Sequence, residues 1–505
     1  MLLTIDSKIR FRLTPDIRQT EPEFVQAIRD DMLVDNPEYA EAVKYNRYAG
    51  NIPEHIVLWE YDALTGTLAV PRGYGRTLSA YLKAFRISWD AVDERVTLNP
   101  VSFDSRIVLR DYQVPAVEAA LKATGGVLVA PAGSGKTQIG LEIIARLGQP
   151  ALWLTHTVGL ADQVAKRAAE FLSLTRDEIG LVGAGRHRVG DRLTIGIIQT
   201  VTNMDLTELG RRFGTVVVDE IHHGPAISWQ NVINQLPARY RFGVTATPER
   251  ADGLQVITER VIGPTFHTVS RAAVSNRLMV PALQVINTGV ESEAWKKHEE
   301  RMKEYQKRAA ELRLQGKAVP KAPIVDWNAL LDELLTNDER NRLIVETLLK
   351  ECPRYYSLVL SKRVEHCLQL AHLLNKTELD RGTKPRLTSS VIHGKLDKKV
   401  REKIIELTRA GKSDVLFAVE IAKEGLDIPR LDRLFLVGGG RNEAETEQKV
   451  GRIQRPFPGK VDAVVFDFVD ELIPPLRAQH WARRKVYRRL GMMGTGGGLK
   501  RRGRS

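Results

Sequence analysis

The sequence predicts an α/β protein with two tandem parallel-sheet domains that follow a small α+β N-terminal domain. Short apolar runs alternate with helical patterns from about residue 106 to 280, and the same rhythm returns from about 340 to 475. A chain of 505 residues is also too long for one hydrophobic core. The expected divisions are an N-terminal domain, a first α/β domain, a linking helical segment, a second α/β domain and a basic tail, at 1–105, 106–285, 286–335, 336–480 and 481–505.

The expected strands of both α/β domains are short apolar runs. Runs that are apolar at successive positions are typical of strands buried on both faces of a parallel sheet. The expected strands of the first domain lie at 127–130, 151–154, 193–198, 216–218 and 242–244, and those of the second at 357–361, 414–419, 433–437 and 462–468.

The remaining segments lack this rhythm. In the N-terminal domain we expect helices at 26–47 and 78–85 and strands at 56–59 and 67–70. The segment 293–314 is highly charged, and its few apolar residues recur at helical spacing. This pattern predicts a helix with an apolar seam that is too narrow for a core and favours docking on a neighbouring surface. The seam residues are Trp295, Met302, Tyr305, Ala309 and Leu312.

The composition indicates a globular protein with a polyanionic partner. Hydrophobic residues make up 43% and charged residues 27% of the chain, and the formal net charge is +13. No apolar run reaches the roughly 18 residues of a membrane span, and no signal peptide is indicated. Cys352 and Cys367 lack metal-ligand spacing and suggest reduced thiols. We therefore expect no membrane partner, and a cytoplasmic or nucleoid-associated location in a bacterial, archaeal or phage-infected cell.

A phosphate-binding loop follows the first strand of the first α/β domain. Its small residues let backbone N–H groups surround phosphate oxygens where a helix begins. Lys136 supplies positive charge to the β- and γ-phosphates, and the hydroxyl of Thr137 is placed to bind Mg²⁺. Ala130 replaces the first glycine of the common pattern and is small enough to fit. The expected ATP-binding residues are Ala132, Gly133, Ser134, Gly135, Lys136 and Thr137.

Two adjacent carboxylates, Asp219 and Glu220, follow the apolar run at 216–218. In open α/β sheets, ligands bind at the carboxyl ends of the strands. Asp219 is therefore expected to hold Mg²⁺ through water, and Glu220 to take a proton from the attacking water. Together with the phosphate loop, this pair predicts that the protein binds ATP with Mg²⁺ and hydrolyses it.

A second group suited to phosphate chemistry lies near the end of the second α/β domain. Gln448, Arg452 and Arg455 are spaced by four and three residues, so on a helix they share one face. Guanidinium groups on one face bind polyphosphate and neutralise charge in the transition state. We therefore expect all three residues to take part in catalysis.

These motifs and their order resemble those of the superfamily 2 helicases and translocases, over about residues 107 to 470. The resemblance implies two RecA-like domains that bind ATP between them, with Arg452 and Arg455 reaching the γ-phosphate. It also implies roles for residues outside the phosphate loop. These are Arg110 and Gln113 at the adenine, His222, Thr245 and Thr247 in coupling hydrolysis to domain movement, and Gly425 and Asp427 at ATP and nucleic acid from the second domain.

The resemblance narrows to the XPB-like and UvsW-like helicases. The run at 245–253 is similar to the XPB type, although Ala251 stands where that type has glutamate, and the turns at 36–39 and 70–73 look like a small domain that engages DNA of unusual shape. By the same resemblance the nucleic-acid contacts are Thr155, His156, Gln199, Thr200, Ser361 and His393. In the N-terminal domain, Arg47, Arg72 and Arg76 are candidates for phosphate contacts.

The sequence thus predicts an ATP-dependent DNA helicase or translocase with ATP and Mg²⁺ as cofactors. The expected partner is single-stranded, forked or branched DNA, and the polarity implied by the resemblance is 3′→5′. An RNA helicase stays open, because the motor motifs do not read the sugar. A motor that moves duplex DNA without unwinding it, as a subunit of a repair or defence complex, also stays open.

Overall fold

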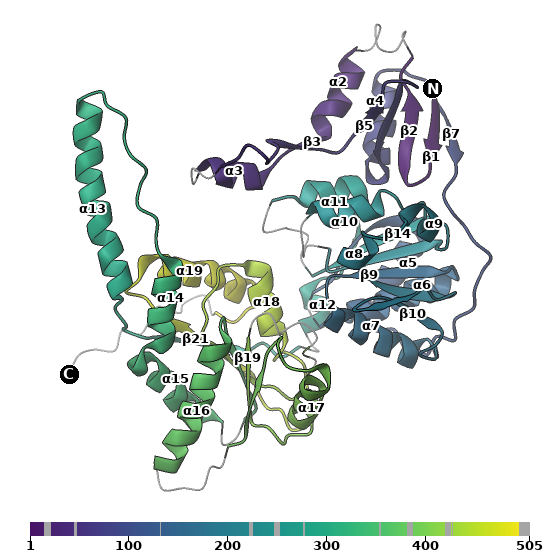
Figure 1. The fold of residues 1–505 in the computed structure, drawn as a ribbon. Helices are drawn as coiled ribbons and strands as arrows, with labels where there is room; N and C mark the ends of the chain where they lie inside the picture. Colours follow the sequence, from purple (N-terminus) through teal and green to yellow (C-terminus); the bar gives the residue numbers. More distant parts are fainter. Residues whose placement is uncertain are drawn as a thin grey trace. The chain divides into compact units, whose positions relative to one another are not determined.

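The computed structural model describes residues 1–14, 22–44, 48–131, 133–221, 226–246, 253–275, 278–352, 355–380, 387–419, 426 and 428–493. The chain forms two compact units, Met1–Val274 and Ser275–Ser505 (Figure 1). The first contains the N-terminal segment and one parallel sheet, and the second contains another parallel sheet. This confirms the predicted fold class of two α/β domains with a small α+β segment before them.

The first unit is built on an eight-stranded sheet in the order β11-β10-β12-β9-β13-β14-β8-β15. All neighbouring strands are parallel except β10 and β11. Its strands are β8 (Gly125–Val129), β9 (Ala151–Thr155), β10 (Ile179–Gly183), β11 (Arg186–Arg188), β12 (Leu193–Ile197), β13 (Thr215–Asp219), β14 (Tyr240–Thr245) and β15 (Thr265–Thr268). Its helices are α5 (Val114–Ala123), α6 (Lys136–Leu147), α7 (Val158–Phe171), α8 (Ile198–Val201), α9 (Leu206–Gly210), α10 (Ala226–Ile233), α11 (Gln255–Val261) and α12 (Arg271–Ser275).

The strands at the centre of this sheet are those that the apolar runs predicted. β9, β12 and β13 are buried at every position, as expected for strands with helices on both faces (Figure 1). The edge strands β11 and β15 were not predicted, nor was β10, which lies between β11 and β12. β11 is the sequence Arg-His-Arg and is exposed throughout, so it has no apolar pattern to recognise.

The N-terminal segment forms a mixed sheet in the order β5-β6-β2-β1-β7, with a separate two-stranded antiparallel sheet of β3 and β4. Its elements are β1 (Leu2–Ile5), β2 (Lys8–Arg12), α2 (Pro22–Asp31), β3 (Leu33–Asp35), α3 (Pro37–Lys44), β4 (His55–Val57), β5 (Glu60–Asp62), β6 (Thr67–Pro71), η1 (Arg72–Tyr74), α4 (Gly75–Ala84) and β7 (Asp90–Asp93). The single helix predicted at 26–47 is wrong. Pro37 disfavours helical backbone at the residue before it, so the chain forms β3 and starts a new helix.

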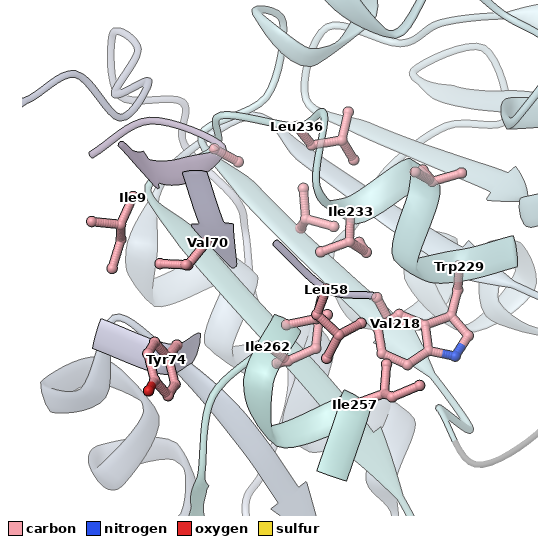
Figure 2. Close-up of a cluster of buried hydrophobic side chains, with 14 of the residues drawn as sticks. Ile9, Leu58, Val70, Tyr74, Val218, Trp229, Ile233, Leu236, Ile257 and Ile262 are labelled. Carbon is pink, nitrogen blue, oxygen red and sulfur yellow. The ribbon is translucent and has the colours of Figure 1, made fainter. Parts of the chain in front are cut away.

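The N-terminal segment shares a hydrophobic core with the first parallel sheet. Figure 2 shows Leu58, Val70 and Tyr74 in one buried cluster with Ile257 and Ile262, which lie in and just after α11. At Gly73 the two parts touch through their backbones, because a Cβ there would lie 2.3 Å from the carbonyl oxygen of Glu259. The N-terminal segment is therefore packed onto the first α/β domain and is not a loosely tethered module.

Two arginines hold this junction by donating to backbone carbonyls. Arg72 donates to the carbonyl oxygens of Ala238 and Arg239 at 2.6 and 2.8 Å. Arg241 is 1% exposed and donates across the junction to the carbonyl oxygen of Ser7 at 3.1 Å. Burial lowers the pKa of Arg241 to about 9. Arg72 was a candidate for a phosphate contact, but its guanidinium is already used here; Arg76 is exposed, and Arg47 lies outside the described residues.

The second unit has a six-stranded parallel sheet in the order β16-β21-β20-β17-β19-β18. Its strands are β16 (Ala282–Asn287), β17 (Ser357–Ser361), β18 (Ser389–Ile392), β19 (Val415–Val419), β20 (Arg433–Leu436) and β21 (Val464–Val469), and its helices are α13 (Glu293–Leu314), α14 (Trp327–Thr336), α15 (Asp338–Glu351), α16 (Val364–Asp380), α17 (Lys398–Arg409), α18 (Glu443–Gly451) and α19 (Pro474–Arg489). Alternate residues of β17 enter two cores. Val359 packs with α15 and α16, while Leu358 and Leu360 pack with α18 and α19.

Two boundaries differ from those expected. β16 begins at Ala282, ahead of the expected end of the first domain at 285, and pairs with β21 in the second sheet. α19 runs past the expected start of the tail at 481, because Val486 and Tyr487 are buried in the second core. Residues 494–505 lie outside the described residues.

The helix predicted at 293–314 is α13, and its seam residues are buried or half-buried. In Figure 1 the chain returns from the far end of α13 to α14. In the returning stretch, Val319, Pro323 and Val325 are half-buried, and Val325 packs with Trp295 against one cluster. The segment that follows α13 therefore covers the apolar seam of this helix at least near Trp295.

We predict that Arg72→Ala destabilises the first unit by about 1–3 kcal/mol, because two buried carbonyl groups lose their donor. The measurement is the midpoint of thermal unfolding of the full chain. Arg76→Ala is the matched control, since Arg76 is exposed one turn along the chain. Equal midpoints for the two variants would show that Arg72 does not hold the junction.

Candidate functional site

The phosphate-binding loop lies between β8 and α6, at the carboxyl edge of the first sheet. Gly133 and Gly135 have φ angles of +80° and +83°, a region that side-chain-bearing residues rarely adopt. A Cβ at Gly135 would lie 2.5 Å from the amide nitrogen of Gln113. These two positions require glycine, and they leave the backbone open toward the start of α6, as a phosphate cradle needs.

Gln113 supports this loop through hydrogen bonds to the backbone. It is fully buried, its amide nitrogen donates to the carbonyl oxygen of Ser134 at 2.8 Å, and its amide oxygen accepts from the backbone N–H of Arg110 at 2.9 Å. The Arg110 guanidinium in turn donates to the hydroxyl of Tyr112 at 2.8 Å. Bracing is a role that the sequence did not suggest for Gln113, whose contact with adenine stays a prediction.

The carboxylates lie at the end of β13, next to the phosphate loop. Asp219 is 5% exposed, and Glu220 follows it in the left-handed region with a φ of +48°. Such a conformation costs a residue with a side chain about 1–3 kcal/mol. Lys136 Nζ lies 3.2 Å from a carboxylate oxygen of Glu220 and donates to the carbonyl oxygen of Ala130 at 3.4 Å. The sheet thus brings Lys136 close to Asp219 and Glu220, although Lys136 and Glu220 are 84 positions apart in the chain.

Burial, followed by the negative charge of Glu220, raises the pKa of Asp219 to about 7, while the positive charge of Lys136 opposes both effects. A buried and a half-buried carboxylate therefore share one nearby ammonium group. This excess of negative charge suits a divalent cation.

The residues present fit Mg²⁺ with a nucleotide better than Mg²⁺ alone. Within the described parts of the chain, no three or more His, Cys, Asp or Glu side chains gather to hold a metal. Mg²⁺ is commonly bound by one or two protein groups plus substrate phosphates. Thr137, half-buried in the first turn of α6, and Asp219 would supply the protein side of such a site.

Thr245, a predicted coupling residue, is joined to the phosphate loop through the backbone. It ends β14, is 1% exposed, and its carbonyl oxygen accepts the N–H of Ala130 at 2.9 Å. Several other candidates lie outside the described residues. They are Ala132, His222, Thr247, Ala251, Gly425 and Asp427.

The expected nucleic-acid residues differ in access. Thr155 and Ser361 are fully buried, and the Ser361 hydroxyl is hydrogen-bonded to His366 Nδ1 at 2.8 Å. Burial, followed by the charge of nearby Arg340, lowers the pKa of His366 to about 3. In this conformation neither hydroxyl is accessible to a phosphate. The sequence could not show this burial, because a residue at the end of a strand can be either buried or exposed. The accessible candidates are Gln199, which is exposed, and Thr200, His156 and His393, which are half-buried.

The predicted catalytic arginines of the second unit do not share a helix. α18 ends at Gly451, Arg452 caps it, and Arg455 follows in a bend. Pro456 disfavours helical backbone at the residue before it, which explains why the helix stops. Arg452 donates to the carbonyl oxygen of Leu426 at 2.6 Å, and Gln448, on α18, is half-buried.

Lys460 is a further residue at this site that the sequence analysis missed. Its ammonium donates to the carbonyl oxygens of Ile453 and Arg455 at 2.6 and 2.8 Å, and to that of Leu431 at 2.7 Å. Burial lowers its pKa to about 8. Lys460 therefore fixes the backbone of the bend that carries Arg455. A single lysine five residues after an arginine carries no sequence signal for this role.

Comparisons with known proteins agree with the two-sheet architecture. Residues 106–250 match the family model for the res subunit of type III restriction enzymes, and residues 331–456 match the helicase conserved C-terminal domain. The chain is 26% identical over 367 residues to the DNA 3'-5' translocase XPB2 of Sulfurisphaera tokodaii, covering 69% of this chain and 79% of that protein. It is 28% identical over 418 residues to the probable helicase D10 of Escherichia phage T5, covering 81% and 82%.

Among solved structures, the crystal structure of T4 UvsW covers 97% of this chain and 98% of its own, with 18% identity and a TM-score of 0.41. Of the helices in the described part of the chain, none has both the length and the apolar character that crossing a bilayer requires.

The raised pKa of Asp219 leads to a pH dependence of Mg²⁺ binding. Below about pH 7 this carboxyl carries a proton that Mg²⁺ must displace, so the Mg²⁺ concentration for half-maximal ADP binding should rise about tenfold per pH unit there. Above about pH 7.5 this Mg²⁺ concentration should become independent of pH. The measurement is titration of a fluorescent ADP analogue with Mg²⁺ between pH 6 and 8. Mg²⁺ binding to the free analogue is the control, and an identical pH profile for the two would contradict the prediction.

The contacts of Lys460 predict that Lys460→Met lowers the kcat of ATP hydrolysis at least about tenfold and leaves ADP affinity within a factor of about two. The reason is that Arg455 loses its fixed backbone while the phosphate loop is untouched. The matched control is Lys350→Met, an exposed lysine of the same unit. An unchanged kcat in Lys460→Met would remove this lysine from the site.

Proposed function

We propose that this chain, which is an ATP-dependent helicase of superfamily 2 related to the XPB-like and UvsW-like proteins, moves along DNA and unwinds or remodels branched DNA. The proposed polarity is 3′→5′, as in the name of its XPB2 relative. The observation that supports hydrolysis best is the cluster of Lys136, Asp219 and Glu220 at one sheet edge, beside a loop whose glycines have positive φ angles.

Each residue of the cluster has a distinct part in the proposed reaction. When bound, Mg²⁺ shields the phosphate charge of ATP. Lys136 leaves Glu220 and binds the β- and γ-phosphates, and the freed Glu220 carboxylate takes a proton from water. Thr137 and Asp219 hold the cation. Because Lys136 exchanges Glu220 for phosphate, Glu220 can act as the base only when ATP is bound.

The second unit supplies the remaining positive charge in the proposal. Arg452 and Arg455 stabilise the charge that develops on the transferred phosphoryl group, and Gln448 lies on the helix that leads to them. Their action on a nucleotide held by the first unit is part of the proposal, and Arg455→Ala tests it. We expect that variant to bind ADP normally and to lose nucleic-acid-stimulated hydrolysis.

The substrate part of the proposal is that DNA, and branched DNA above all, stimulates the motor. The DNA-acting XPB2 relative and the likeness of the N-terminal segment to a DNA-shape-reading domain support it. A strong salt dependence follows from phosphate contacts. The exposed residues Gln199 and Arg76 are available for such contacts.

The test is the ATPase rate of the full chain with single-stranded, duplex, forked and four-way DNA and with RNA, all at one salt concentration. We expect forked and four-way DNA to stimulate most, and Glu220→Gln to lower every rate at least about 100-fold while it still binds ADP. The matched control is Glu170→Gln, an exposed glutamate on α7. Near-normal hydrolysis in Glu220→Gln would overturn the assignment of the base.

The same assay separates the alternatives. Stronger stimulation by RNA would indicate an RNA helicase. Stimulation by duplex DNA without strand displacement from a 3′-tailed fork would indicate a translocase that does not unwind. Displacement from 5′-tailed forks alone would reverse the proposed polarity.

A further inference from the structure

We infer that His156 is a positioning residue for the base Glu220, a role distinct from any contact with nucleic acid. The inference rests on the proposed function, because it concerns the same ATP site. His156 Nε2 lies 3.2 Å from the backbone carbonyl oxygen of Glu220. A carbonyl oxygen only accepts hydrogen bonds, so the ring carries its proton on Nε2 and donates it.

The strand pairing explains why these two residues meet. β9 and β13 are parallel neighbours, and Leu154 is level with Val218. Two residues further along each strand end, His156 therefore stands beside Glu220. Both residues leave the sheet at its carboxyl edge, so the contact does not depend on a long or mobile loop.

The backbone of Glu220 needs such support. Its φ of +48° is uncommon for a residue with a side chain, and conformations of this kind persist only where the surroundings fix them. The Asp219 carboxylate accepts the backbone N–H of Glu220, and His156 donates to its carbonyl oxygen. Hydrogen bonds thus fix the peptide groups on both sides of the Glu220 Cα. Because the backbone is fixed, the direction of the Glu220 side chain is fixed as well.

The position of His156 gives its hydrogen bond to Glu220 a second consequence. His156 is half-buried, and it lies in the strand-end turn where nucleic acid is proposed to bind. A displacement of the ring by bound DNA would act on the Glu220 carbonyl directly. His156 therefore links occupancy of the DNA site to the placement of the base, without any change in the phosphate loop.

The experiment compares His156→Phe with His156→Gln in the full chain. Phe keeps a flat ring but has no donor, whereas the amide nitrogen of Gln can take the place of Nε2. We expect His156→Phe to lower kcat at least about tenfold both without DNA and at saturating DNA, because a base displaced by about 1 Å loses much of its effect. The KM for ATP and the DNA concentration for half-maximal stimulation should stay within about twofold of the unaltered protein.

His156→Gln should recover most of the kcat, and His187→Phe, on the exposed strand β11, is the matched control. A rise in the DNA concentration for half-maximal stimulation with an unchanged DNA-free kcat would overturn the inference and leave His156 as a DNA contact alone. So would equal losses in Phe and Gln variants of normal thermal stability. Failure of the unaltered protein to respond to DNA would instead count against the proposed function, since the DNA-free comparison does not depend on it.

Discussion

The ATP site depends on how two adjacent carboxylates are kept at the end of a buried strand. Asp219 and Glu220 lie where the sheet excludes most water, and Lys136 is the cation placed against them. Burial raises the pKa of Asp219, and so does the charge of Glu220, because one ammonium group does not balance two carboxylates. In the proposed function the remaining negative charge would attract Mg²⁺, and the phosphates that accompany Mg²⁺ would attract Lys136 away from Glu220. The residues for binding and those for hydrolysis are therefore linked by charge before any substrate arrives.

The same sheet also links the N-terminal segment to the motor, at the edge where β14 begins. α11 follows β14, the strand that ends at Thr245, and it packs against η1 and the hydrophobic cluster of the N-terminal segment. Arg72 and Arg241 close this junction by donating to backbone carbonyl groups across it. If nucleic acid binds the N-terminal segment, its effect reaches the first α/β domain through packed side chains and backbone, because the two parts share one hydrophobic core.

The sequence was sufficient for those parts of the fold in which local pattern and tertiary environment agree. The buried strands β9, β13 and β17 read as apolar runs because both of their faces are covered, and α13 was found because its seam has helical spacing. The phosphate loop was recognisable because only glycine tolerates the backbone at Gly133 and Gly135. The predictions were weaker where a long-range contact decides the structure. The pattern at 26–47 did not reveal the strand β3, and nothing local shows that Ser361 is capped by a buried histidine or that Lys460 holds the Arg455 bend.

The basic residues show most clearly what a sequence leaves undetermined. An arginine that binds phosphate and one that binds a backbone carbonyl are the same letter, and both add one to a net charge of +13. Arg72, Arg241 and Lys460 use their donors on carbonyl oxygens inside the protein. Arg340 and Arg483 are instead paired with Asp470 and Asp467. The first group contributes to the net charge yet offers nothing to a polyanion. The number of phosphates that the protein neutralises is therefore limited by its exposed lysines and arginines, and is smaller than the net charge alone suggests.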